Sequence, residues 1–108
     1  MAVWTPGSYL VREFARHVER VVAQGTGGAD LPVAKTRKNR WRIETRGSGR
    51  ITVRYRVYGR EMSVRTNWIE NRFALLNGAP TFLTLAEAGV RRPHLVSLEL
   101  PAAWKTSV

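Results

Sequence analysis

The chain has 108 residues, which is enough for one domain and too few for a second independent core. It carries 18 Lys and Arg against 8 Asp and Glu, so its formal net charge of +10 suits a nucleic acid, an anionic membrane or an acidic protein partner. Cysteine is absent, which excludes disulfides, thiolate zinc sites and cysteine nucleophiles. No apolar run approaches the roughly 18–20 residues of a membrane span.

The first third of the chain predicts a turn, a short helix and a hairpin. Thr5-Pro-Gly-Ser8 has Pro and Gly at the central positions of a type II turn. Residues 9–23 fit both a helical face and a strand, and we expect one short helix near residues 8–16 followed by a strand. The cluster Gly25–Asp30 reads as a hairpin loop, because it lacks the spacing of a phosphate-binding loop.

The middle of the chain carries the clearest alternation of polar and apolar residues. Trp41–Arg46, a turn at Gly47–Gly49 and a second run, Ile51–Tyr58, predict a hairpin between the two runs. Along the second run every other side chain is apolar, so one face should be buried and the other solvated.

Shorter strand candidates follow. They are Met62–Trp68, Thr81–Leu85 and Leu95–Leu100, with a turn at Asn77-Gly78 before the second of them. Short strands at turn-signalled intervals, with little helix, predict an all-β fold built as an antiparallel β-sandwich, or a piece of one.

Groups suited to catalysis are few. Ser8, His17 and Asp30 form a conceivable set, but any chain of this length offers one, so capping and surface roles are favoured. His17 and His94 lie 77 positions apart and no second ligand follows either at helical spacing, so no metal site is predicted. We expect no catalysis by this chain alone, with His17 at an element boundary and His94 in a loop.

A nucleic-acid surface is the main alternative reading of the charge. It rests on four arginines with two aromatic side chains as stacking groups: Arg42, Arg54, Arg56, Arg65, Tyr58 and Trp68. Alternating arginines are, however, the ordinary solvent face of a basic sheet, and Arg is also the cation best suited to protein interfaces. We therefore favour a solvated or protein-binding face and keep a stand-alone nucleic-acid-binding β-domain as the alternative.

One motif is far more specific. The run from Trp4 to Phe14, W-T-P-G-S-Y-x-x-R-E-F, resembles the N-terminal domain of the glycyl aminopeptidase family of zinc metallopeptidases. The similarity continues through shorter echoes in the same order: Lys38–Trp41, Val53–Tyr58, Ser63–Thr66, Asn77-Gly78, Phe82-Leu83 and Leu100–Lys105. The resemblance thus spans essentially the whole of residues 1–108, which we read as a single domain.

The resemblance implies a non-catalytic β-rich domain that precedes a thermolysin-like catalytic domain, often with a PDZ-like domain further on. In such proteins zinc belongs to the catalytic domain, so no zinc ligand is carried over to this chain. Family members have strand-forming sequence before the motif, whereas Met1 and Ala2 precede Val3 here. We accordingly expect a domain that lacks its first strand or strands, with the catalytic domain of the same polypeptide as its partner.

The resemblance also suggests candidate contact residues. Tight turns with polar tips can reach across an interface, so Ser8, Tyr9 and Asn77 are candidates for contact with peptide substrate or with the catalytic domain. The alternative is structural: Trp4 and Tyr9 would pack on the sandwich, Pro6 and Gly7 would make the turn, and Ser8 would cap the helix. Three further motif residues, Arg12, Glu13 and Trp41, are expected to be structural.

Overall fold

A computed structural model describes residues 1–86 and 92–108 of the chain. Its elements are short and come in this order: η1 (Phe14–His17), β1 (Val18–Gln24), η2 (Thr26–Gly28), β2 (Asp30–Leu31), β3 (Val33–Arg37), β4 (Arg40–Ile43), β5 (Thr52–Val57), β6 (Trp68–Ile69), β7 (Ala74–Leu75) and α1 (Gly78–Thr81). Within the described residues, no helix has the length and hydrophobicity needed to cross a membrane.

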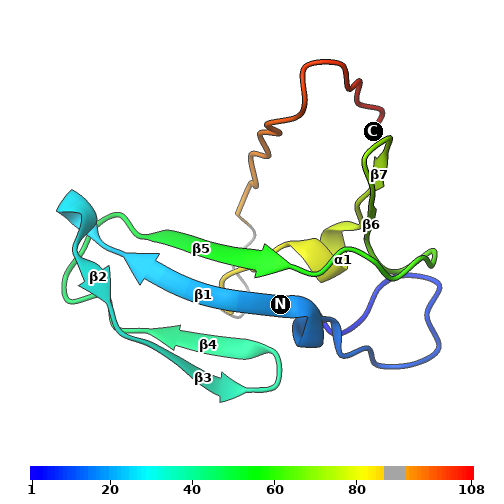
Figure 1. The fold of residues 1–108 in the computed structure, drawn as a ribbon. Coiled ribbons are helices and arrows are strands. Elements are labelled where there is room, and N and C mark those ends of the chain that lie inside the picture. Colours follow the sequence, from blue (N-terminus) through cyan, green and yellow to red (C-terminus); the bar gives the residue numbers. More distant parts are fainter. Residues whose placement is uncertain (87–91) are drawn as a thin grey trace.

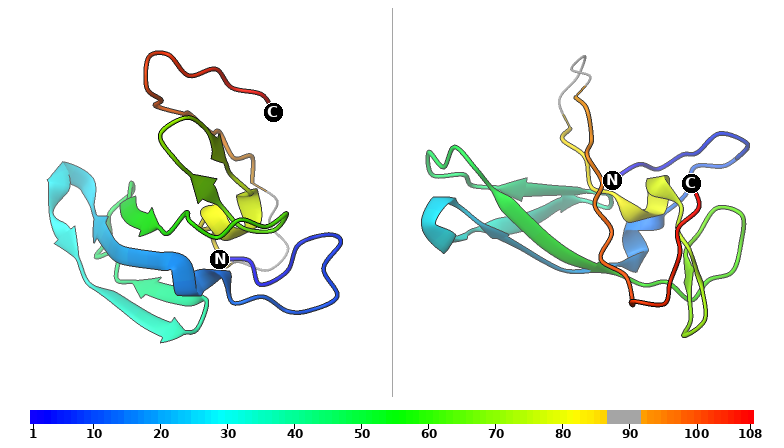
Figure 2. Two further views of the ribbon diagram at one scale, coloured as in Figure 1. Left: turned by 45° about the vertical axis from the view of Figure 1, so that its right-hand side comes forward. Right: turned by 90° about the horizontal axis from the view of Figure 1, so that it is seen from above.

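The strands form three small antiparallel sheets. One sheet has the order β2-β1-β5, and the other two are the hairpins β3-β4 and β6-β7 (Figure 1). The two hairpins extend in different directions from the longer strands β1 and β5 (Figure 2). The mostly β, antiparallel prediction is confirmed, whereas no second layer closes a sandwich in the part of the chain that the structure describes.

The first predicted hairpin is confirmed. Strand β1 pairs with β2 across the loop Gly25–Asp30, with Ala23 opposite Leu31 and both side chains buried. The single short helix near the N-terminus is the 3-10 helix η1, which begins at Phe14, later than the expected start near Ser8.

The second predicted hairpin is wrong. Strand β4 pairs with β3 across a two-residue turn, and β5 pairs with β1, with Val53 opposite Ala23. Pairing of β3 with β4 closes a shorter loop than pairing of β4 with β5 would, so its loop-closure entropy cost is lower. Strand β5 instead places Val53 beside Ala23, on the opposite side of β1 from Leu31. The predicted alternation along β5 is confirmed, and its inward side chains are half-buried.

The three later strand predictions are corrected as well. Of the predicted strand Met62–Trp68 only Trp68 lies in a strand, β6, because hydroxyl groups at Ser63 and Thr66 bond locally and compete with a sheet ladder. In the predicted strand Thr81–Leu85, Thr81 is the last residue of α1 and residues 82–85 form no strand. Residues 95–100 likewise have no strand partner among the residues described.

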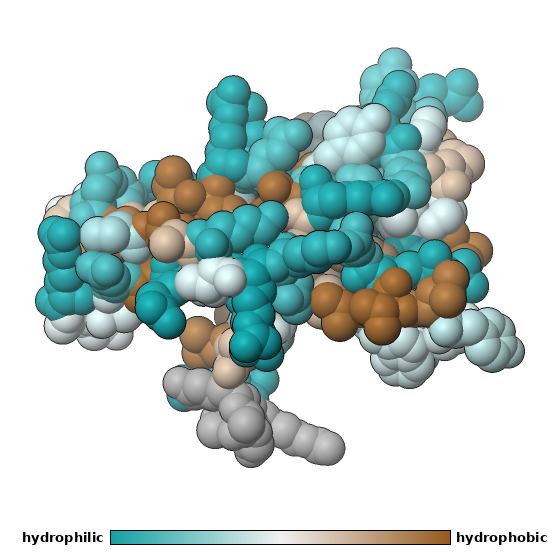
Figure 3. Space-filling model, turned by 90° about the horizontal axis from the view of Figure 1, so that it is seen from below, coloured by the Kyte–Doolittle hydropathy of each residue, from teal (hydrophilic) through white to brown (hydrophobic). Residues whose placement is uncertain are grey.

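The domain is open. Four hydrophobic side chains are buried in the described parts of the chain: Phe14, Ala15, Ala23 and Leu31. The accessible surface is 8949 Å², whereas a folded monomer of 12.2 kDa exposes about 6,100 Å². The radius of gyration of 15.3 Å exceeds the value of about 13 Å typical of a compact domain of this length. Figure 3 shows hydrophobic side chains at several places on one face of the molecule.

Candidate functional site

The turn at residues 5–8 forms as predicted and organises the N-terminal loop (residues 3–12). Ser8 N–H donates to the Thr5 carbonyl at 3.1 Å, and Gly7 has the positive φ of +82° that this turn requires. Arg12 N–H donates to the Val3 carbonyl at 2.6 Å and thereby closes the loop at its base. Pro6 and Gly7 therefore have the structural role expected of them.

Ser8 is buried in this loop, but it does not cap a helix. Its hydroxyl donates to the Leu10 carbonyl at 2.9 Å and accepts from Arg12 Nε at 3.0 Å. The residue at the start of η1 is Glu13, which makes no side-chain cap. The expected capping role was wrong, because Ser8 lies inside the closed N-terminal loop and the helix begins six positions later, at Phe14. Ser8 instead fixes the position of the Arg12 guanidinium.

Tyr9 is fully exposed, so the expected packing of this ring on a sandwich is corrected. Trp4 is half exposed and is held by its Nε1–H, which donates to the Ser8 carbonyl at 2.8 Å. Leu10 and Val11 are exposed beside Tyr9. Three consecutive large side chains thus project from a closed, hydrogen-bonded loop.

Asn77 precedes α1 and is tied to a second loop. Its Nδ2 donates to the Thr66 carbonyl at 2.6 Å, and its backbone N–H donates to Asn67 Oδ1 at 2.8 Å. Asn67 is buried and also contacts the Thr81 hydroxyl at the end of the helix. The predicted turn at Asn77-Gly78 is therefore the entry to a one-turn helix, and the Asn77 side chain is already bound to its own chain.

The 61–67 loop lies between the two candidate turns. It is closed by Glu61 N–H donating to the Asn67 carbonyl at 3.3 Å. Arg65 Nη2 donates to the Gly7 carbonyl at 3.3 Å, while the next residue accepts the bond from Asn77. Ser8 and Asn77, 69 positions apart in sequence, are thus connected through this one loop, which the sequence analysis read as a strand.

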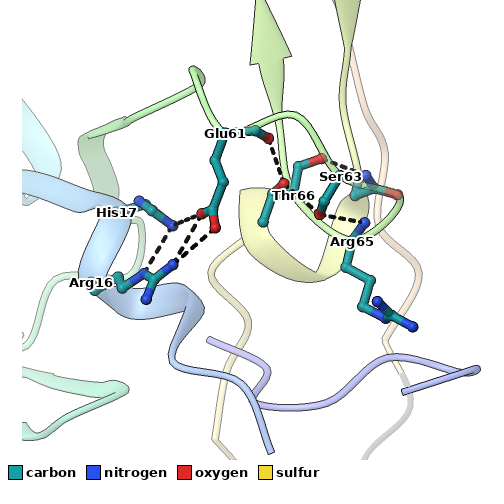
Figure 4. A network of polar contacts seen from close by, with 7 residues as sticks. Arg16, His17, Glu61, Ser63, Arg65 and Thr66 are labelled. Carbon is teal, nitrogen blue, oxygen red and sulfur yellow. Dashed lines mark hydrogen bonds and ion pairs between the residues drawn. The ribbon is translucent and has the colours of Figure 1, made fainter. Parts of the chain in front are cut away.

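Glu61 joins the other end of this loop to η1 (Figure 4). Arg16 Nη2 lies 3.1 Å from its carboxylate and His17 Nε2 lies 2.8 Å from it. The hydrogen bond from Arg16, with a smaller contribution from His17, holds the pKa of the Glu61 carboxyl below its ordinary value of 4.5. His17 stands at the end of η1, half-buried, as predicted.

A single nitrogen of His17 contacts both charged partners. Nε2 lies within 3.1 Å of Arg16 Nε as well as near the Glu61 carboxylate. With its proton on Nε2 the ring donates to Glu61, and with its proton on Nδ1 it accepts from Arg16. The imidazole can therefore serve either neighbour, but not both at once.

The two loops and η1 enclose a pocket of about 360 Å³. Its polar lining comes from elements far apart in sequence: Arg12, Glu13, Arg16, His17, Glu61, Ser63, Arg65 and Thr66. Sequence reasoning missed Arg16 and Glu61 as site residues because neither belongs to a recognisable spacing. The local signal was the pair Ser63 and Thr66 inside an apparent strand, since hydroxyl side chains at that spacing favour a closed loop.

The remaining motif residues have structural contacts. Glu13 accepts from Lys38 Nζ at 2.6 Å, which lowers the pKa of the Glu13 carboxyl and connects η1 to the turn between β3 and β4. The ring of Trp41 on β4 lies beneath Lys35 Nζ, 5.2 Å from its centroid. Glu13 and Trp41 thus each contact a lysine of the β3-β4 hairpin or its turn.

Ser8, His17 and Asp30 do not form a catalytic set, since no hydrogen bond joins any two of them in the part of the chain that the structure describes. Asp30 accepts from Gln24 at the end of the first sheet, whereas Ser8 and His17 have the partners given above. No group of three His, Cys, Asp or Glu side chains suited to a metal occurs in residues 1–86 and 92–108. Of the proposed stacking rings, Tyr58 stacks on His17 at 5.7 Å and Trp68 lies beneath Arg60 at 4.9 Å. His94 lies in a loop, as predicted.

Comparison with known proteins agrees with the motif. The model of the peptidase M61 N-terminal domain matches residues 1–108. A crystal structure of an aminopeptidase N family protein from Idiomarina loihiensis superposes with a TM-score of 0.59 at 38% identity, over 65% of this chain and 12% of that one. No curated protein matches the chain. The expected resemblance is confirmed: the chain belongs to the peptidase M61 N-terminal domain family.

Proposed function

We propose that this domain has no catalytic role of its own and acts by docking on the catalytic domain of an M61 peptidase. The proposal rests on the solvent-accessible surface area of the chain, which exceeds that of a compact monomer of the same mass by nearly half. Family membership supplies the class of partner, since an N-terminal domain of a peptidase shares its polypeptide with the peptidase unit.

In the docked state the domain would shape the cleft near the N-terminus of the peptide substrate. A wall of fixed shape favours one orientation of a bound peptide and keeps water from the reacting bond. A shallow cleft at this wall would also account for selectivity for glycine, because larger side chains would not fit. Zinc would belong to the catalytic domain.

Ser8, Tyr9 and Asn77 would contribute in different ways. Tyr9 is free to touch substrate or partner, because its ring is fully exposed and its hydroxyl has no bond among the described residues. Ser8 and Asn77 are bound to their own chain and would act as positioning residues for the two loops. Of the three residues, Tyr9 would therefore make the direct contact with substrate or with the catalytic domain.

The test is steady-state kinetics of the full peptidase on glycyl peptides. Tyr9→Phe and Asn77→Ala should each lower kcat/KM by about threefold to tenfold, because each removes a polar contact at or beneath the cleft wall. The matched control Asn71→Ala changes an exposed asparagine away from the proposed site and should leave kcat/KM unchanged. Unchanged kinetics for both test variants would remove these residues from the site.

A further inference from the structure

Exposed apolar side chains stand on both loops beside the arginine-lined pocket. Tyr9 is completely exposed and Val11 is 74% exposed on the N-terminal loop. On the facing 61–67 loop, Met62 is 63% and Val64 is 79% exposed. Both loops are closed by backbone hydrogen bonds and joined by Arg65, so these side chains are held outward by a built framework.

Two arginines of this pocket keep donors to spare. Arg12 makes one side-chain bond, from Nε to Ser8, and Arg65 makes one, from Nη2 to the Gly7 carbonyl. Both are half-buried against the same pocket, and their other guanidinium nitrogens have no partner among the residues described. A guanidinium with free N–H groups is suited to a carboxylate, which it can bind with two parallel hydrogen bonds.

The carboxylates of this chain near the pocket are already engaged. Glu61 is bound by Arg16 and His17, and Glu13 is bound by Lys38. The spare donors of Arg12 and Arg65 are therefore open to a carboxylate from another molecule or domain. The net charge of +10 gives such a partner a favourable electrostatic approach.

Surface area is consistent with a protein partner. A specific interface buries about 800 Å² on each side, and the open surface of this chain exceeds that of a compact monomer by about 2,800 Å². Exposed aromatic and aliphatic side chains around half-buried arginines also match the residue types that are enriched in interface centres.

We propose that the pocket rim, defined by Tyr9, Val11, Met62 and Val64 around Arg12 and Arg65, is the face that docks on the catalytic domain. The inference rests on the proposed function and specifies its chemistry: the partner surface presents a carboxylate, surrounded by apolar side chains, to the two arginines.

Binding of this 108-residue chain to the separately purified catalytic domain of the same peptidase tests the proposal, by calorimetry at two salt concentrations. The variant Arg12→Gln/Arg65→Gln and the variant Tyr9→Ser should each raise Kd by about tenfold or more. The controls are Arg54→Gln and Leu95→Ser, which remove an exposed cation and an exposed apolar side chain elsewhere, and they should change Kd by less than about twofold. Tyr9→Ser keeps the test decisive if the arginine variant fails to fold, because a fully exposed ring contributes little to the fold.

The outcomes separate the two levels of the proposal. Binding by the native chain that the two rim variants do not weaken would overturn the rim assignment and leave docking intact. No binding by the native chain would overturn docking itself. If a DNA or RNA oligonucleotide binds the native chain more tightly than the catalytic domain does, and depends on the same arginines, the rim is a nucleic-acid surface and the assignment is overturned.

Discussion

Gly7 is the residue whose backbone most directly determines the shape of the N-terminal loop. Its φ of +82° lies in the region that side chains with a Cβ avoid, although no atom lies within 4 Å of where a Cβ would stand. Gly7→Ala should therefore destabilise the chain by about 1 kcal/mol through backbone strain alone. Urea denaturation measures this change. Gly49→Ala, also in open space but with no positive φ, is the matched control and should be neutral or slightly stabilising.

Glu61 gives the stability of the chain a pH dependence at the acid end. Since the folded-state pKa of this carboxyl is lowered, its stabilising effect is complete above its unfolded value of 4.5 and is lost as pH falls through the folded value. Glu61→Gln should remove this part of the acid destabilisation and lower stability at neutral pH by no more than about 1 kcal/mol, because the pair is exposed to solvent. Denaturation at pH 7 and at several values below 4.5 provides the measurement, and an unchanged acid slope would contradict it.

The sequence predicted individual residues well where their role is local. The turn at Pro6-Gly7 and the boundary position of His17 follow from residue chemistry within a few positions. The cluster of Arg16, His17 and Glu61 joins positions 45 apart, and no spacing rule indicates such a meeting. Tyr9 had two readings, a contact residue at a turn tip or a ring packed on the sheet, and residue type could not decide between them; the ring is exposed.

At the scale of elements, β1 is interrupted by an irregularity. The pairing with β5 shifts register between Glu19 and Val22, and Arg20 within it has a positive φ of 51°. A left-handed conformation is unfavourable for Arg by about 1–2 kcal/mol and is free for Gly. Arg20→Gly should therefore be neutral or should stabilise the chain by up to about 1 kcal/mol, after the entropy cost of Gly.

Arg54→Gly is the control for this prediction. Arg54 lies opposite Val22 on β5, has the same side chain and adopts no positive φ. Glycine at an ordinary strand position should destabilise by about 0.5–1 kcal/mol. Chemical denaturation of both variants would contradict the strain argument if they lost stability equally.

Asn67 connects the 61–67 loop to α1. Its side chain is almost completely buried, accepts from the Asn77 backbone and contacts the Thr81 hydroxyl. Asn67→Ala should destabilise the chain by about 1–3 kcal/mol, because these buried polar groups lose their partner. The exposed Asn71→Ala is the control, and equal midpoints in thermal denaturation for the two variants would show that the network is not stabilising.

The sequence predicted which face of a strand is turned inward, but it did not predict which strands pair with one another. Alternation along β5 defined which side chains are half-buried, because period 2 is intrinsic to an extended chain. It carried no information on which strand pairs with β5, and the actual partner, β1, is distant in sequence. Segments such as 95–100 show the same limit, since a strand needs a neighbouring edge and alternation alone does not supply one.

At the scale of the whole molecule, open packing should be visible in unfolding. Surface scaling gives about 17,700 Å² for the unfolded chain, so folding to 8949 Å² buries about three quarters of what a compact domain of this mass buries. The urea m-value follows the surface exposed on unfolding and should be reduced in the same proportion. An m-value equal to that of compact domains of this length would mean that the chain closes further in solution.

Docking should bury part of the surface that folding alone leaves exposed. This expectation distinguishes a domain that is completed by its partner from one that is only loosely folded. A partner that binds only the folded state adds about 2.7 kcal/mol to stability when its free concentration is a hundred times Kd, and the midpoint rises with it. The catalytic domain should therefore raise the Tm of this chain in a concentration-dependent manner. Tyr9→Ser should leave the Tm of the free chain unchanged and reduce the increase at a fixed partner concentration, because the ring contributes to the interface and not to the fold. An increase that is equal in the native chain and in this variant would place the docking surface away from the pocket rim.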